Sequence, residues 1–466
     1  MSNSILTLAM ITTVIAAASI YLSPATRDAA LFFRGVSASG AAPSILSLTL
    51  SQVTTWIFAR SIMNAAILGY FYGVAGALAY AAYYASFLTG AWIISGIRFR
   101  HGFDSVQGFI ADRFGLAGTS TYNLVIALRL VSEVFANLLV IGLIFGGEGS
   151  GNYVAAIFLV GAVTFGYAAM GGLSASIRTD VFQMWIFLAA LILLLAVAMT
   201  TGTFDIAAVT GALPEITNPG WVLVLVALLQ VWSYPLHDPV MMDRGFIADR
   251  KTTMASFYHA GWISFLCIMA FGLLGVWAGL NKLEGESFVP ALTRLIGEWP
   301  TLLFNIALVI SCMSTLDSTL SSTAKLAVVD MQLAKPTVWN GRIAMAVFLL
   351  AGLAMVFLGS KDLFGAVAVS GTASMFLAPV VFFSIWLGQE EIPVWSYLTA
   401  FCSSISAAVI YFTDTAGYTT IMVGLTGLEH KYSQLLVLCV AALAMGCGAF
   451  ILGMVFRRRP ATAGTV

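Results

Sequence analysis

Charged residues are scarce in this chain. Asp, Glu, Lys and Arg make up 9% of its 466 residues, whereas soluble globular proteins carry about 25%. Hydrophobic residues account for 60%, which excludes a soluble globular protein and indicates a chain that crosses the membrane many times. The 21 basic and 21 acidic side chains balance, so net charge gives no indication of a nucleic-acid partner.

Cysteine and histidine are also rare, and neither forms a recognisable metal motif. All five cysteines fall in apolar segments without CxxC spacing, which supports neither a disulfide framework nor a cysteine metal site. The four histidines show no HExxH or other metal-binding spacing. We therefore do not expect an enzyme.

Long apolar runs are what the chain does contain. Segments of about 20 residues, long enough to cross the hydrocarbon core of a bilayer, recur along the sequence with short polar joints. Thirteen spans are expected, at residues 4–22, 43–68, 73–97, 120–147, 152–170, 181–200, 221–243, 256–280, 300–331, 342–359, 363–388, 392–413 and 433–456.

Lysine and arginine are distributed unevenly between the two sides of this arrangement. Cytoplasmic loops carry the excess of both residues, so the richer side is expected to face the cytoplasm. With the N-terminus outside, the inner loops receive fourteen: Arg27, Arg34, Arg98, Arg100, Arg113, Arg178, Arg244, Arg250, Lys251, Lys335, Arg342, Arg457, Arg458 and Arg459. The outer loops receive four: Lys282, Arg294, Lys361 and Lys431. The asymmetry predicts an outer N-terminus and an inner C-terminus.

The most unusual segment is SCMSTLDSTLSS, residues 311–322, which places seven hydroxyls and the carboxylate of Asp317 inside an apolar span. At 100° per residue, the hydroxyls of Ser311, Ser314, Thr315 and others share one helix face. Hard oxygen ligands in a row suit an alkali cation, because oxygen must replace the water that the ion sheds. Hydrogen bonding between helices is the alternative, and the pattern alone does not choose.

A second unusual segment is VWSYPLHDPV, residues 231–240, which interrupts an apolar span with two prolines, His237 and Asp238. Proline removes a helix hydrogen bond, and irregular backbone at membrane depth persists only where it lines a cavity or is buried in protein. We interpret this segment as a broken helix at a solute site, with a simple proline kink as the alternative.

Three other polar features lie inside or beside apolar spans. Arg129 and Glu133 are four residues apart and can pair on one helix face, which we interpret as structural. Asp180 follows a glycine pair at the start of the sixth span, where it either complements the helix dipole or ligates a cation. A polar patch at residues 49–56 begins five spans before the proline-broken one, which is the spacing of an inverted repeat of five plus five helices.

Two segments resemble the sodium:solute symporter family, which includes sodium/glucose, sodium/proline and sodium/sialic acid symporters. They are GGLSASIRTDVFQ at residues 171–183 and MSTLDSTLSS at residues 313–322, and the resemblance extends from AALFFRG at residues 29–35 to about residue 387. It implies an all-α LeuT-type fold of two inverted five-helix repeats.

The resemblance also sets the expected organisation. Residues 1–42 form an additional N-terminal helix and loop, and residues 43–200 and 221–388 form the two repeats. Residues 392–456 form two additional helices, and residues 457–466 form a basic tail.

In that family, sodium lies between the unwound first repeat helix and the hydroxyl-rich helix. By position, the resemblance implies a principal sodium site made by Leu50, Val53, Ser311, Ser314 and Thr315, with backbone carbonyls from the first three. A second sodium site, found in some members, maps onto Asp180, Ser314, Asp317 and Ser318. Asp317 departs from the hydroxyl of better-known members, so it either strengthens that site, titrates or pairs with Lys325.

The resemblance says less about the solute site, because the substrate-binding residues vary within the family. By position it is expected to involve Gln52, Trp56, Trp232, Tyr234, His237, Ser370, Thr372 and Ser374. His237 either binds the solute or caps freed backbone carbonyls.

The expected function is sodium-coupled symport of a small polar organic solute into the cell, with sugars, amino acids, carboxylates and vitamins as candidate classes. Proton coupling through Asp180, Asp238 or Asp317 is the main alternative. A transporter-like sensor is the other, although only a short tail follows Arg459, so no signalling domain is expected. The expected partners are the solute, Na⁺ and the lipid bilayer. The expected location is the cell membrane, as in a bacterial inner membrane.

Overall fold

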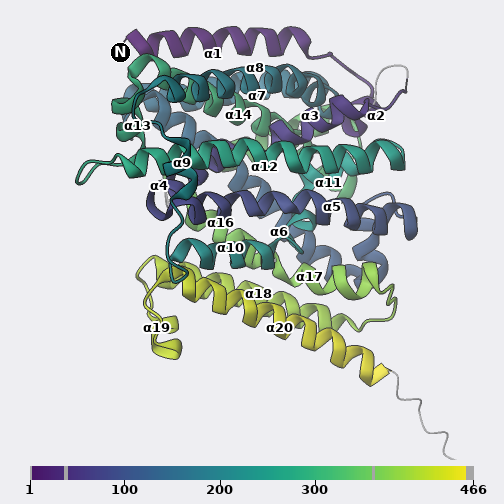
Figure 1. The fold of residues 1–466 in the computed structure, drawn as a ribbon. Coiled ribbons are helices and arrows are strands. Elements are labelled where there is room, and N and C mark those ends of the chain that lie inside the picture. Colours follow the sequence, from purple (N-terminus) through teal and green to yellow (C-terminus); the bar gives the residue numbers. More distant parts are fainter. Residues whose placement is uncertain (1–2, 36–39, 359–362, 458–466) are drawn as a thin grey trace, which may run out of the picture.

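The computed structural model describes residues 3–35, 40–358 and 363–457, and all regular secondary structure in these ranges is helical. Figure 1 shows the long helices lying side by side, most of them with similar axis directions. Eleven helices in the described ranges are long and apolar enough to cross a membrane. The chain is therefore a multi-pass helical membrane protein, as predicted.

The helices follow one another without strands in the described ranges. The α-helices are α1 (Asn3–Leu22), α2 (Ala29–Arg34), α3 (Ile45–Trp56), α4 (Ala59–Ala82), α5 (Ser86–Ile94), α6 (Val106–Phe145), α7 (Gly151–Gly171), α8 (Leu173–Thr200), α9 (Ile206–Gly211), α10 (Pro219–Gln230), α11 (Pro239–Gly245), α12 (Arg250–Leu280), α13 (Phe288–Ile296), α14 (Glu298–Lys325), α15 (Val338–Leu358), α16 (Leu363–Ala373), α17 (Leu377–Pro379), α18 (Val394–Thr415), α19 (Ile421–Thr426) and α20 (Lys431–Arg457). The short 3-10 and π segments are η1 (Tyr83–Ala85), η2 (Ser95–Arg100), η3 (Tyr234–His237), η4 (Leu326–Asp330), η5 (Ser374–Phe376) and η6 (Val380–Trp386).

Two of the predicted spans are interrupted, and these account for the difference between eleven long helices in the described ranges and thirteen expected spans. The span at residues 43–68 is α3 followed by α4, with non-helical backbone at Ile57. The span at residues 221–243 is α10, η3 and α11, with Pro239 opening the last of these. The predicted broken helix at the proline pair is therefore confirmed.

Glycine ends α7 and begins α8 in the predicted tight turn. Gly172 adopts φ +56°, and a Cβ there would lie 2.3 Å from the carbonyl oxygen of Phe32, so only glycine fits. Helix α8 then begins at Leu173, earlier than the expected span start at residue 181. Asp180 consequently lies two turns inside α8, which removes the dipole explanation for its position.

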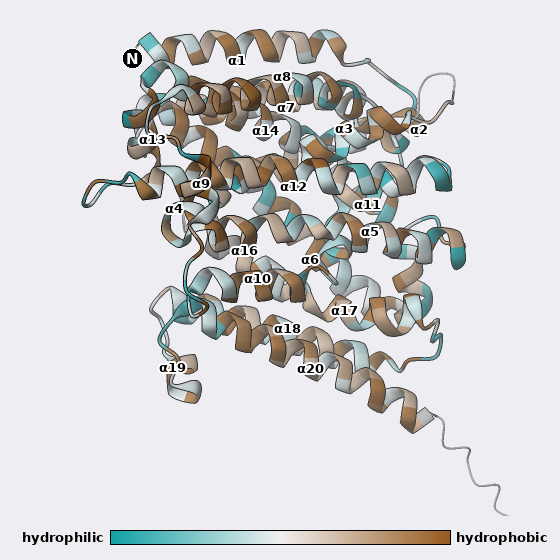
Figure 2. Cartoon of the chain, viewed as in Figure 1, coloured by the Kyte–Doolittle hydropathy of each residue, from teal (hydrophilic) through white to brown (hydrophobic). Residues whose placement is uncertain are grey.

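Helix α14 lies at the centre of the bundle. It packs against α8, α6, α15, α7, α1 and α3. In its most apolar stretch 78% of residues are buried, against 28% for α1 at the edge. Figure 2 shows hydrophobic colour dominating the peripheral helices α1 and α20. The bundle therefore turns apolar side chains outward and encloses the polar face of α14.

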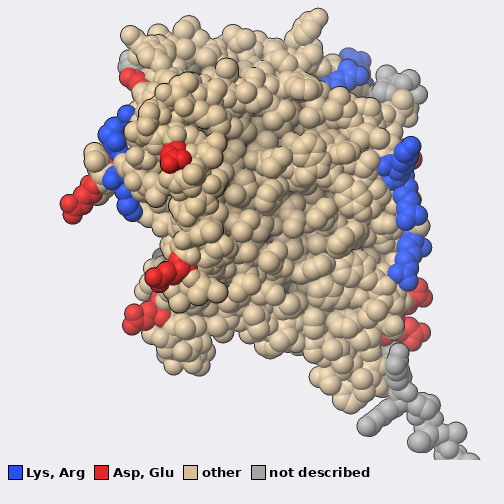
Figure 3. Space-filling model, viewed as in Figure 1, with Lys and Arg blue, Asp and Glu red and all other residues tan. Residues whose placement is uncertain are grey.

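Charged side chains lie at the two ends of the bundle. On the face drawn in Figure 3, a broad uncharged band separates them, with Lys and Arg prominent at the end away from the N-terminus. This band is what a lipid bilayer requires. Arg244 is a correction to the loop assignment, because it lies in α11 and is fully buried. Lys361, Arg458 and Arg459, and residues 458–466 of the predicted tail, lie outside the described residues.

Candidate functional site

The polar face of α14 meets the end of α3. The Ser311 hydroxyl donates a hydrogen bond to the Ile57 carbonyl oxygen, and the Thr315 hydroxyl lies 3.4 Å from the Thr55 carbonyl oxygen. Helix α3 ends at Trp56, because Ile57 leaves helical geometry at ψ 77°. The broken end of α3 thus offers main-chain oxygens to α14.

The carbonyls of Leu50 and Val53 make other hydrogen bonds. The Leu50 oxygen accepts from the Thr54 hydroxyl at 2.8 Å, and the Val53 oxygen accepts from the Ile57 N–H at 3.0 Å. Both residues are buried in α3, which packs against α14 and α8. The carbonyls that hydrogen-bond to α14 belong to Thr55 and Ile57, so Leu50 and Val53 as ligands stay predictions.

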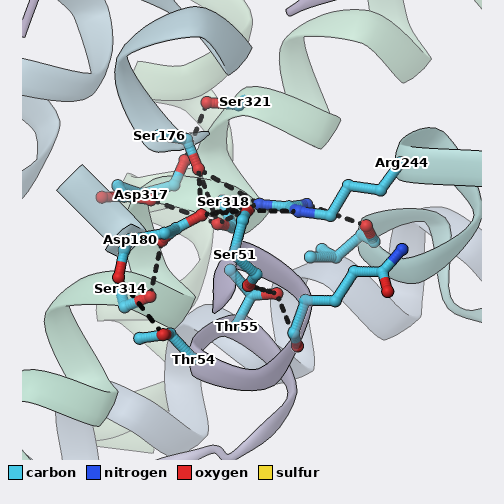
Figure 4. Close-up of polar contacts among 12 residues, drawn as sticks. Ser51, Thr54, Thr55, Ser176, Asp180, Arg244, Ser314, Asp317, Ser318 and Ser321 are labelled. Carbon is cyan, nitrogen blue, oxygen red and sulfur yellow. Dashed lines mark hydrogen bonds and ion pairs between the residues drawn. The ribbon is translucent and has the colours of Figure 1, made fainter. Parts of the chain in front are cut away.

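Asp180 connects α8 with both α3 and α14. Its Oδ1 accepts from the Ser314 hydroxyl at 2.6 Å, and its Oδ2 accepts from the Ser51 hydroxyl at 2.6 Å. All three side chains are buried. Figure 4 shows this carboxylate pointing into a cluster of hydroxyls from the three helices. Ser314, which is predicted for both sodium sites, therefore joins the hydroxyl face of α14 to Asp180.

Asp317 and Ser318 complete this cluster one turn further along α14. Asp317 accepts from the Thr179 hydroxyl at 3.0 Å and from the Ser318 hydroxyl at 3.2 Å. The hydroxyls of Ser318 and Ser176 are 2.7 Å apart. The structure thus brings together all the residues predicted for a second site.

Lys325 does not pair with Asp317, which removes one of the predicted alternatives. Its Nζ lies 2.6 Å from Asp243 Oδ1 and 3.4 Å from Asp330 Oδ2. Lys325 is the last residue of α14, and η4 follows it, so the lysine lies beyond the hydroxyl cluster.

Arg244 enters the hydroxyl cluster from α11 and was not predicted there. Its Nη2 lies 3.0 Å from Asp180 Oδ2 and 2.8 Å from the Ser318 hydroxyl. The available signal was its position, five residues after the second proline, where the broken span continues. Assigning Lys and Arg to loops by their place in the sequence does not reveal an arginine that is buried among the helices.

Aromatic rings enclose the other side of the break in α3. The Trp56 ring contacts Tyr84, Phe87 and Tyr234 edge to face, with centroids 5.2, 5.1 and 5.7 Å apart. Its Nε1–H donates to Asp238 Oδ2 at 3.1 Å. The broken ends of α3 and of the α10–η3–α11 segment therefore touch, and a solute site between them stays a prediction.

Gln52 and His237 place polar groups in this region. Gln52 is buried, and neither atom of its side-chain amide has a hydrogen-bond partner within the described structure. The His237 ring nitrogens lie 2.8 Å from the Tyr234 carbonyl oxygen and 3.1 Å from the Ser370 hydroxyl. His237 thus makes the predicted backbone contact, while Gln52 has its donor and acceptor unused.

The remaining predicted solute residues separate into two groups. Ser374 lies 3.3 Å from Ser233, and the Thr372 hydroxyl lies 3.3 Å from the Gln230 amide, so α16 and η5 flank the broken segment. Trp232 instead packs on Trp92 and Trp386 with centroids 6.5 and 5.6 Å away. Trp232 therefore packs in a tryptophan cluster that is separate from the rings around Trp56.

A second buried ion network lies beside the aromatic cluster. The predicted pair of Arg129 and Glu133 is present, and it is joined by Arg60, whose guanidinium is 2.7 Å from Glu133. Arg129 also lies 3.0 Å from Asp238. Two arginines and two carboxylates balance here and link α4, α6 and the broken segment.

Comparison with known proteins supports the fold. No protein-family model matches the sequence, and no curated protein matches it. A Na⁺-coupled sialic acid symporter in a substrate-bound outward-open state superposes with a TM-score of 0.71 at 15% identity, covering 96% of this chain and 98% of the symporter.

Two further solved structures are similar. A nucleobase-cation-symport-1 family transporter with bromovinylhydantoin bound gives a TM-score of 0.58 at 16% identity, covering 93% of this chain and 95% of that one. A manganese transporter from Eremococcus coleocola gives 0.51 at 12% identity, covering 89% and 95%. At such low identity the likeness concerns the fold, and this chain has the LeuT-type helical fold of secondary transporters.

Proposed function

We propose that this protein is a sodium-coupled symporter that carries a small polar organic solute into the cell by alternating access. The observation that carries the proposal is the meeting of the α14 hydroxyls with the broken end of α3 and with Asp180. The sodium:solute symporter family resemblance and the fold of the Na⁺-coupled neighbour support the same function. We place the protein in the cell membrane, in the manner of a bacterial inner-membrane carrier.

The oxygen atoms in this region suit a sodium ion. Ser311, Ser314 and Thr315 supply hydroxyls, the end of α3 supplies carbonyls, and Asp180 supplies negative charge. A dehydrated alkali cation needs several hard oxygen ligands at once. Asp180 already pairs with Arg244 at 3.0 Å, whereas no Lys or Arg of the described residues lies within ion-pair distance of Asp317, so a bound cation would compensate the remaining charge. These groups come from three helices, so a cation there ties α3, α8 and α14 together.

Coupling follows from the position of α3. Its end contacts α14 through Thr55 and Ile57, while Gln52 and Trp56 belong to the expected solute site. A cation bound between α3 and α14 therefore holds the same turn of helix that contacts solute. By linkage, any gain in solute affinity that sodium causes is matched by an equal gain in sodium affinity that solute causes.

The solute is expected to be polar and able to both donate and accept hydrogen bonds. The Gln52 amide has one group of each kind unused inside the protein. Burying an unpaired amide group costs about 1–3 kcal/mol, so a solute that pairs with it gains binding free energy. Trp56 and Tyr234 offer ring faces for the apolar side of the same molecule.

An inner route lies beside α11. A cavity of about 1000 Å³ is lined by residues that include Asp243, Lys325 and Asp330, on the side predicted to be cytoplasmic. Asp243 also accepts from the Ser322 hydroxyl at 2.8 Å, so α11 forms the wall between this cavity and the hydroxyl face of α14. Movement of α11 would open the site towards the cavity.

The first step of the test is to identify the solute. Purified protein is screened by thermal shift against sugars, amino acids, carboxylates and vitamins, with sodium and with choline in its place. Stabilisation by a compound that requires sodium is the expected result, because a ligand that binds only the folded state raises the melting temperature. The compound found is then used for transport.

Uptake in proteoliposomes then separates sodium from proton coupling. Asp180 and Asp317 lie in one cluster and are connected through the hydroxyls of Ser176 and Ser318, which is the observation that favours a proton as the alternative ion. We expect uptake under an inward sodium gradient without a pH gradient. Uptake driven only by a pH gradient would overturn the sodium assignment.

A further inference from the structure

We propose that Arg244 is a built-in cation that fills the second cation position of the hydroxyl cluster, so that the protein binds one exchangeable sodium ion. The inference rests on the proposed sodium-coupled function and specifies its ion stoichiometry. Arg244, which was expected in a loop and is buried in α11, thereby gains a role in ion binding.

The guanidinium of Arg244 uses all three of its nitrogens. Nε donates to the Ser51 hydroxyl at 2.8 Å, and Nη1 donates to the Val240 carbonyl oxygen at 2.8 Å. Nη2 lies 3.0 Å from Asp180 Oδ2, 2.8 Å from the Ser318 hydroxyl and 3.3 Å from the Ser176 hydroxyl. The arginine is fully buried, and Figure 4 shows it reaching into the cluster from α11.

The oxygens that surround Arg244 are those that a sodium ion would use. Three serine hydroxyls and one carboxylate, from α3, α8 and α14, converge on the guanidinium. Two of them, from Asp180 and Ser318, belong to the predicted second sodium site. A sodium ion cannot share these oxygens with the guanidinium, because the two positive charges would lie within contact distance of each other. The arginine therefore excludes sodium from this position.

Charge balance gives the number of exchangeable cations. The cluster holds two carboxylates, Asp180 and Asp317, and one guanidinium, Arg244, which leaves one negative charge. The other nearby cation, Lys325, is committed to Asp243 and Asp330. Buried charge in a membrane protein is normally compensated. One monovalent cation beside Ser314 would neutralise the cluster, and a second would make it positive.

The second ion network does not alter this count. Arg60 and Arg129 pair with Glu133 and Asp238, so that group of side chains is neutral by itself. It contributes no net charge towards the hydroxyl cluster. Lys325 with Asp243 and Asp330 leaves one further negative charge, but these three residues line the inner cavity. The single negative charge of the hydroxyl cluster therefore belongs to Asp180, Asp317 and Arg244.

The test counts sodium ions bound to the purified full-length protein by equilibrium dialysis with radioactive sodium, without solute. We expect one sodium ion per wild-type chain. A count of two overturns the role of Arg244 and leaves sodium coupling intact. A count of zero overturns sodium coupling itself and, with it, this inference.

Three variants sharpen the count. Arg244→Ala removes the resident cation and should raise the count from one to two, whereas Arg244→Lys keeps a positive charge and should leave it at one. The double variant Arg244→Ala/Asp317→Asn restores a single negative charge and should return the count to one. A count of one in a monodisperse Arg244→Ala protein contradicts the proposal. If Arg244→Ala does not fold, the wild-type count and the double variant decide.

Discussion

Two of the buried ion networks in the described part of the chain differ in their balance of charge and hydroxyls. In the first, Arg60 and Arg129 meet Glu133 and Asp238, and positive and negative charges are equal. In the second, Asp180, Asp317 and Arg244 leave one negative charge. Serine and threonine surround the second network, whereas aromatic rings such as Phe58 flank the first.

The comparison separates a structural role from an ion-binding role. A balanced network can remain closed throughout transport, because each charge keeps its partner within the protein. In the proposed mechanism, a mobile cation completes the unbalanced network, which is rich in hydroxyl oxygens. Both networks contact the broken helices, the first through Asp238 and the second through Ser51 of α3. We therefore expect substitutions in the first network to change mainly stability and substitutions in the second to change mainly sodium dependence.

The largest expected effect is on stability and comes from the balanced network. Glu133→Gln leaves Arg60 and Arg129 buried without their shared carboxylate, and breaking such a pair costs about 3–5 kcal/mol. We expect a much lower melting temperature, measured by thermal shift. The sodium dependence of the folded fraction should stay unchanged.

Glu284→Gln is the matched control, because it makes the same chemical change at an exposed glutamate in the loop after α12. Its melting temperature should equal that of the wild type. Equal melting temperatures for the Glu133 and Glu284 variants would contradict a structural role for the balanced network.

The broken helix and one ion pair could be predicted from the sequence, because their signals are local. Two prolines four residues apart break α10 from α11, and the spacing of Arg129 and Glu133 places them on one helix face. The hydroxyl face of α14 was predicted for the same reason. Helical periodicity shows which residues share a face, and in a membrane span a polar face is buried.

The partners from distant helices could not be predicted. Arg60 and Arg244 have charged partners 73 and 64 residues away in sequence, so no local pattern reveals them. The ring contacts of Trp232 could not be predicted for a related reason. Once a helix breaks, periodicity no longer tells which way the next side chain points, and Trp232 packs on Trp92 and Trp386.

The next largest effect concerns sodium affinity and the unbalanced network. Asp180→Asn removes the negative charge shared by Ser51, Ser314 and Arg244. Hydrogen bonds to charged groups contribute about 1.5–3 kcal/mol, so we expect a roughly ten- to hundredfold rise in the sodium concentration for half-maximal transport. Proteoliposome uptake across a sodium titration measures it. An unchanged sodium requirement would place the ion elsewhere.

Removing one hydroxyl should have a smaller effect on the same quantity. Ser314→Ala and Thr315→Ala each delete one expected ligand oxygen, and a neutral hydrogen-bonding group contributes about 1 kcal/mol, or roughly fivefold in sodium concentration. Thr323→Ala is the matched control, since among the described residues the Thr323 hydroxyl donates to the Leu320 carbonyl of its own helix alone, at 2.7 Å. Sodium titration should separate the first two variants from the control. Three identical titrations would count against this placement.

The smallest effect is expected at an ion pair outside the membrane. Arg294 beside Glu286 lowers the pKa of that carboxyl from 4.5 to about 2, and the pair joins the loop before α13 to that helix. Because the pKa is lower in the folded state than in the unfolded state, the ionised carboxylate stabilises the folded protein at pH values above the unfolded-state pKa. This stabilisation disappears as pH falls from 4.5 towards 2. Thermal shift should show a small difference between wild type and Glu286→Gln at pH 6 that disappears near pH 2. A difference that persists at acid pH would show that the pair is not its cause.

Hydrogen–deuterium exchange tests the location of the cation most directly, because it needs no knowledge of the solute. Wild-type protein is compared in sodium and in N-methyl-D-glucamine at equal ionic strength. We predict that sodium slows exchange in peptides covering residues 51–58 of α3 and its break and residues 311–318 of α14, and that Ser314→Ala weakens this protection. Exchange in both segments that is the same with and without sodium would contradict the account.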